Sequence, residues 1–163
     1  MIAFANNISK KLFQSKDSFD EYIDHARQKC KELKESALLV EEDDHIYSIE
    51  TTQEALGLDS ELIDSLLEDY VVQVIKAVPQ FHQMIKQLRK DIKQGRDTDF
   101  TPLHDLAHKN LGVARNLRIK DAQKILHFIM TSSDLDKIER CLEYLEACAI
   151  LLKPKAAYEV YSS

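Results

Sequence analysis

The strongest constraint on this chain is a helical spacing of apolar residues that persists over roughly thirty positions in its middle. Between Asp59 and Gly95, large apolar side chains recur every three or four residues, in phase with the 3.6-residue turn of an α-helix. Asp59 and Ser60 are residue types that cap helix N-termini, and Gly95 is a residue type that commonly follows a helix end. Pro79 lies inside the run and lacks an N–H, so we expect one long helix that bends there.

Three shorter amphipathic segments follow, over residues 99–117, 120–130 and 133–153. Ser133 is a suitable N-cap for the last of them. The chain has only three Gly and three Pro, which favours helix almost throughout. Because four amphipathic helices joined by short connections can bury their apolar faces together, we expect an all-α fold, an antiparallel four-helix bundle over residues 55–153.

The two ends of the chain carry weaker patterns. Residues 1–54 are expected to form an extension that contains a helix, opened by a capping box of Ser18 and Glu21. Between residues 37 and 52, short apolar runs flank an acidic segment. This pattern fits either a short β-hairpin or a structured linker. Residues 154–163 are expected to be a frayed C-terminal tail.

Composition excludes several functional classes. No apolar run approaches the ~20 residues that span a bilayer, and the first residues lack the apolar core of a signal peptide. With 22 basic and 28 acidic residues the net charge is −6, which argues against a nucleic-acid surface. Cys30, Cys141 and Cys148 form no CxxC pair, so we expect three small buried side chains. Together these features predict a cytoplasmic protein with neither membrane nor nucleic acid as a partner.

Residues 99–118 are the chemically informative stretch. At about 100° per residue, the apolar side chains of this segment form one stripe, and His108 falls about 120° from its centre, facing solvent. Gly112 lies one turn later on the outer side, flanked by Arg115. A glycine inside a helix costs about 1 kcal/mol relative to alanine, and its use here is to let another molecule come close. An exposed imidazole beside such a bare patch predicts docking of a partner's active site over His108.

The run from Ala107 to Ala114 resembles a histidine-containing phosphotransfer domain. That family carries its phosphorylated histidine, a glycine four residues later and a small residue six residues later on one helix of a four-helix bundle. His108, Gly112 and Ala114 match these three places. The likeness extends over residues 55–153 and leaves roughly the first fifty residues outside it.

The resemblance implies a phosphorelay intermediate that carries a phosphoryl group on His108 between receiver-domain aspartates. It implies a receiver domain, a histidine kinase or both as partners, a monomeric state, and no cofactor of its own, with Mg²⁺ held by the receiver. The docking face implied around His108 comprises Gly112, Lys109, Arg115, Leu111 and His104. Of these, Lys109 and Arg115 are close enough in sequence to assist the phosphoryl group electrostatically, or are plain solvated charges. His104, nearer the core edge, is expected to pack or to form a hydrogen bond.

Three departures from the family pattern leave a second function open. The family has a lysine three residues after the histidine, where this chain has Leu111, and an apolar residue at the place of Asn110. It also often has a Gly or Ala pair further on, where this chain has Arg118 and Ile119. The alternative is therefore a degenerate module of the same fold that binds a receiver or another signalling protein without chemistry.

The histidines of this chain fit two further interpretations. His108 taken alone fits a surface histidine without a function, since six histidines are spread along the chain. His104 and His108, four residues apart with Asp105 between them, also imitate the HExxH zinc motif. A catalytic zinc site needs a third ligand, and no such pattern follows, so we expect no metal site.

Overall fold

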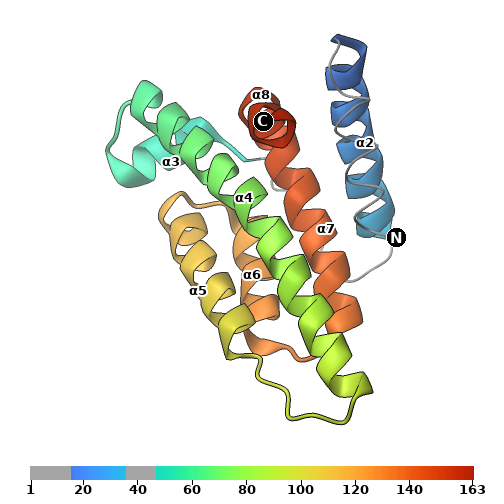
Figure 1. Cartoon of the computed structure of the whole chain (residues 1–163). Helices are drawn as coiled ribbons and strands as arrows, with labels where there is room; N and C mark the ends of the chain where they lie inside the picture. Colours follow the sequence, from blue (N-terminus) through green and yellow to red (C-terminus); the bar gives the residue numbers. More distant parts are fainter. Residues whose placement is uncertain (1–15, 36–46) are drawn as a thin grey trace.

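The computed structural model describes residues 16–35 and 47–163, and every regular element in these ranges is an α-helix (Figure 1). The helices are α2 (Lys16–Glu35), α3 (Ile49–Leu56), α4 (Ser60–Lys93), α5 (Thr101–Asn116), α6 (Lys120–Thr131), α7 (Leu135–Leu152) and α8 (Pro154–Ser162). The predicted all-α class is thus confirmed for this part of the chain.

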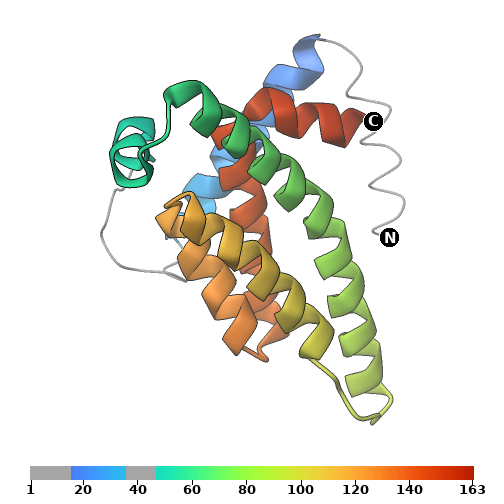
Figure 2. The same cartoon turned by 90° about the vertical axis from the view of Figure 1, so that its left-hand side faces the viewer.

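Helices α4 to α7 pack against one another in a closed circuit. Each of them contacts the next along the chain, and α7 returns to contact α4. Helix α2 packs on α7 from outside this group, so that α7 lies between α4 and α2 (Figure 1). The turned view in Figure 2 shows the short α8 crossing the end of α7 at a steep angle.

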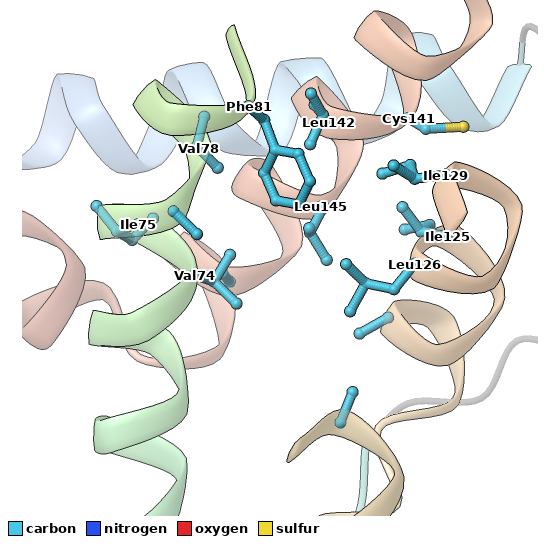
Figure 3. Packing of buried hydrophobic residues seen from close by; sticks show 14 of the residues in the cluster. Val74, Ile75, Val78, Phe81, Ile125, Leu126, Ile129, Cys141, Leu142 and Leu145 are labelled. Atoms are coloured by element: carbon cyan, nitrogen blue, oxygen red, sulfur yellow. The ribbon is translucent and has the colours of Figure 1, made fainter. Parts of the chain in front are cut away.

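The apolar faces of these helices meet in one core. Phe81 of α4 is fully buried, and its ring lies beside Leu142 and Leu145 of α7, with the apolar side chains of α6 on the far side of the core (Figure 3). Each helix is apolar mainly on the face that it turns to this core, as the spacing of three and four predicts. Accordingly, none of the helices described has both the length and the apolar character that crossing a bilayer requires.

The ends of α4 lie where the sequence predicts them. The Asp59 carboxylate accepts a hydrogen bond of 2.8 Å from the Leu62 N–H, and this satisfies a donor that the helix itself leaves free. Gly95 adopts a left-handed φ of 66° just after the helix, a conformation that glycine takes without steric cost. Pro79 lies inside α4, as predicted.

The cap of α7 is Asp134 and not the predicted Ser133. The Asp134 carboxylate accepts a hydrogen bond of 3.1 Å from the Lys137 N–H, three residues later. Helix α7 accordingly begins at Leu135. Both residue types cap helices well, and the tertiary position of the helix start decides between two adjacent candidates.

Residues 47–56 differ from the predicted β-hairpin. Ser48 accepts a hydrogen bond of 3.2 Å from the Thr51 N–H and caps α3, which begins at Ile49. The second strand is therefore wrong, because a local cap outweighs the short apolar alternation. The first strand, around residues 38–40, falls outside the described residues. The capping box of Ser18 and Glu21 is wrong as well, because α2 already runs from Lys16 and Ser18 therefore does not open the helix.

The C-terminal residues form a packed helix where a frayed tail was expected. Helix α8 starts at Pro154, a residue well suited to the first turn of a helix. Ala157 is fully buried. The ring centroids of Tyr158 and Tyr161 lie 5.5 and 5.0 Å from that of Tyr22 in α2. These contacts hold the end of the chain against α2.

A half-buried carboxyl group at the same end of α7, that of Glu146, gives a pH prediction. Burial, with a smaller contribution from Glu143, raises the pKa of Glu146 from its usual 4.5 to about 7. The protonated side chain fits this partly desolvated site, so its stabilising contribution is complete below pH 4.5 and disappears as the pH rises through 7. Above pH 7 the partly desolvated carboxylate lowers the free energy of unfolding.

We expect Glu146→Gln to raise the free energy of unfolding by roughly 2 to 3 kcal/mol at pH 8 and by less than about 1 kcal/mol at pH 5. Urea denaturation at the two pH values measures the difference. Glu159→Gln, at an exposed position on α8, is the matched control and should change stability little at either pH. An equal effect of Glu146→Gln at both pH values would contradict the expectation.

Candidate functional site

His108 lies in the middle of α5, and its imidazole is exposed. Leu103, Ala107 and Ala114 on the opposite face are at most 1% exposed and pack into the core. The orientation predicted from the helical stripe is therefore confirmed. In the described ranges the imidazole has no hydrogen bond or ion pair, so both ring nitrogens are available to an incoming group.

Three other predicted site residues share this exposed surface of α5. Lys109, Gly112 and Arg115 are all exposed. They lie within seven residues of His108 along one helix, so this helix carries two cations and a bare glycine on its exposed side together with the imidazole. Asn116 at the last position of the helix is exposed as well.

His104, one turn before His108, has a structural role. Its side chain is half-buried, and its Nε2 atom lies 2.8 Å from the Ser132 carbonyl oxygen at the end of α6. Since a carbonyl only accepts, Nε2–H is the donor. The ring also packs against Phe100, with centroids 5.7 Å apart. The expected hydrogen-bonding role is confirmed, and it joins the start of α5 to the end of α6.

The HExxH-like pair of histidines would need further ligands to bind a metal ion. Among the residues that the structure describes, no group of three or more His, Cys, Asp or Glu side chains is placed to hold a metal ion. With Nε2 of His104 occupied by the Ser132 carbonyl group, one nitrogen of the HExxH-like pair is already used.

Leu111 does not belong to the docking surface, and this expectation is corrected. Its side chain is 0% exposed and lies in the core. It follows Ala107 by four residues, so the two side chains point the same way. The family likeness placed Leu111 near the phosphoryl group, but burial makes it unavailable to a partner.

Asn110 sets the rotation of α5 about its own axis. Its amide is buried, with 1% of the residue exposed, and its Oδ1 accepts a hydrogen bond of 3.0 Å from Gln73 of α4. Its Nδ2 donates to the Leu106 carbonyl oxygen at 2.9 Å. A buried polar group with both partners fixes geometry strongly. Because this bond turns Asn110 to α4, His108 two residues earlier faces away from that helix.

Gln73 is a residue that sequence reasoning missed. Its position on α4 carries no signal that connects it to a residue 37 positions later. Nothing in the spacing of α4 distinguishes it from the other polar residues of that helix.

Gly112 is not required by the packing of the chain. A Cβ atom built on it meets no atom within 4 Å, and its φ is not left-handed. The described fold therefore supplies no steric or backbone reason for a glycine here. What the glycine provides is an uncovered stretch of helix backbone one turn from His108.

A shallow hollow of about 320 Å³ lies between α4 and α5 beside this surface. Lys76 and Lys109 contribute cations to its lining, and Asp69 contributes a carboxylate. His108 is not among its lining residues. The hollow therefore lies on the side of α5 that faces α4, whereas the imidazole of His108 is exposed to solvent on another side of the helix.

An exposed, unpaired imidazole can act as a nucleophile toward an electrophilic group that a partner brings to it. Comparisons with models of protein families, with curated proteins and with solved structures found no match. The chemistry that can be attributed to the site therefore follows from its own residues.

Proposed function

We propose that this protein is a histidine phosphotransfer protein, which carries a phosphoryl group on His108 between aspartates of receiver domains in two-component signalling. The observation that carries the proposal is the placement of His108. It stands exposed on a helix whose opposite face is buried, one turn from a glycine that the fold does not require. This arrangement leaves room for a partner's active site to close over the imidazole.

The reaction would proceed by in-line displacement at phosphorus. A nitrogen of His108 attacks the phosphorus of a receiver's aspartyl phosphate, so the N–P bond forms while the P–O bond to the aspartate breaks and its carboxylate leaves. The proton on the other ring nitrogen passes to solvent. The receiver supplies Mg²⁺ and this chain needs no cofactor of its own. Lys109 and Arg115 place positive charge near the phosphoryl oxygens, on which the transition state carries its negative charge.

The helix contacts support a bundle that suits this role. Helices α4 to α7 pack in a closed circuit, and we interpret them as the antiparallel four-helix bundle of a phosphotransfer domain, with α2 as an added helix. We further propose that the protein acts as a cytoplasmic monomer. Its partners would be a receiver domain, a histidine kinase or both, with neither nucleic acid nor membrane involved.

One observation favours a second candidate, a module of the same fold that binds a receiver without chemistry. The family carries a lysine three residues after its histidine, and here that place is taken by the wholly buried Leu111. The cation that would sit nearest the phosphoryl group is thus absent. Lys109, on the other side of His108, would have to supply this positive charge.

The two candidates are distinguished by labelled phosphoryl transfer from a panel of phosphorylated receiver domains to the purified protein. We expect acid-labile, alkali-stable label on the wild-type protein and none on His108→Gln. His127→Gln removes an exposed histidine from α6 and is the matched control, which should take label like the wild type. If no variant takes label while wild type and His108→Gln bind a receiver equally, the binding module is the correct assignment.

A further inference from the structure

We propose that Cys30 and Cys148 are a redox-responsive pair that forms a disulfide between α2 and α7 on oxidation by a hydroperoxide. The two residues are 118 positions apart in sequence and come from two helices that pack along each other. This inference concerns a different surface from His108 and does not depend on the proposed phosphotransfer.

The geometry brings the two sulfur atoms into contact. Cys30 Sγ and Cys148 Sγ are 3.8 Å apart, and both residues are free thiols. Both are only partly buried, so the expectation of three buried cysteines is wrong for these two and confirmed for Cys141. A disulfide requires about 2.05 Å between the sulfurs. Forming the bond therefore requires the two sulfur atoms to approach each other by about 1.75 Å.

The environments of the two thiols shift their pKa values in opposite directions. The hydrogen bond with Cys148 lowers the pKa of Cys30 against the opposing effect of its burial, and the charge of Lys34 lowers it further. The same hydrogen bond, followed by burial, raises the pKa of Cys148 well above its usual value. Because the thiolate is the nucleophile, Cys30 is the residue that attacks and Cys148 the residue that resolves.

The site is accessible to a small oxidant. Cys148 lines a hollow of about 260 Å³ whose wall also includes Tyr70 of α4 and Ala122 of α6. A peroxide molecule is much smaller than this volume. The hollow therefore offers a small oxidant a route to Cys148, whereas Cys30 does not line the hollow and is itself only partly buried.

The reaction balances with hydrogen peroxide as the oxidant. The Cys30 thiolate attacks one peroxide oxygen, the O–O bond breaks, and the products are Cys30 sulfenic acid and, after protonation, water. The sulfur of Cys148 then attacks the sulfenic sulfur, the S–S bond forms, and the sulfenic oxygen leaves as a second water. Two thiols are oxidised and one peroxide is reduced to two waters. A dithiol reductant reverses the step by thiol–disulfide exchange.

Cys141 provides a matched control within the same helix. It lies seven residues before Cys148 on α7 and is 3% exposed. Burial raises its pKa to about 11. It should therefore remain a thiol under conditions that oxidise the pair.

The experiment treats the full chain with graded hydrogen peroxide, then counts thiols under denaturing conditions and maps disulfide-linked peptides. We expect the wild type to lose two of its three thiols and to yield a peptide pair joining Cys30 to Cys148. Cys141→Ser should lose both of its thiols in the same way. Cys30→Ser and Cys148→Ser should form no intramolecular disulfide, and a dithiol reductant should restore all thiols of the wild type.

A second readout tests whether the bond joins the helices. Limited proteolysis followed by non-reducing electrophoresis should leave α2 attached to α7 in the oxidised wild type and release it after reduction. Retention of all three thiols, a disulfide that includes Cys141, or disulfides only between molecules would each overturn the proposal. Oxidation of Cys148→Ser to the sulfinic acid at Cys30, with none in the wild type, would support the assigned order of attack.

Discussion

Replacing Phe81 by alanine is expected to lower the free energy of unfolding by about 4 kcal/mol, the middle of the range for truncating a buried aromatic residue. Phe81 is 0% exposed and is the largest of the fully buried side chains. Its ring fills the space beside Leu142 and Leu145, where α4 meets α7 (Figure 3). Truncation leaves a cavity between helices that are distant in sequence, so the neighbours can only partly collapse into it.

Urea or thermal denaturation followed by circular dichroism measures this loss. Ile92→Ala on the same helix is the control, because Ile92 is 55% exposed and its truncation should change stability by less than about 0.5 kcal/mol. Similar losses for Phe81→Ala and Ile92→Ala would contradict a core centred on the contact between α4 and α7.

Gly112→Lys is expected to weaken binding of the cognate receiver by about 100-fold or more, which corresponds to roughly 3 kcal/mol. The substitution puts a long charged side chain on the bare helix surface one turn from His108. A Cβ there meets nothing within 4 Å of the chain itself, so the folded protein should accommodate the change. The loss would then arise at the interface and not from unfolding.

Two variants make this result interpretable. Gly112→Ala should raise the stability of the protein by about 0.5 to 1 kcal/mol, because alanine favours a helix interior over glycine. It should also weaken receiver binding far less than lysine does. Gln83→Lys adds the same charge at an exposed place on α4 and should leave binding unchanged. Isothermal titration calorimetry with the receiver measures the binding affinity of all three variants. Unaltered binding by Gly112→Lys would place the docking face elsewhere.

The sequence determined those features that depend on neighbours along the chain. The course of α4, its cap at Asp59 and the left-handed Gly95 after it follow from local spacing and capping chemistry. The outward direction of His108 follows from the same spacing, because side chains three and four residues apart share one face of a helix. Local rules gave a wrong prediction where two of them competed. At Ser48 the short apolar alternation predicts a strand, but the capping hydrogen bond of Ser48 starts a helix there.

Only the tertiary structure decided which distant residues meet. The hydrogen bond from Gln73 to Asn110, that from His104 to Ser132, and the approach of Cys30 to Cys148 each join different elements. Helix α8 likewise gains its order from packing against α2, α4 and α7, and its own nine residues are too few for a stable isolated helix. The spacing of residues along one helix predicts the direction in which each side chain points. The residue of another helix that meets this side chain depends on how whole helices rotate and shift as they pack into a common core.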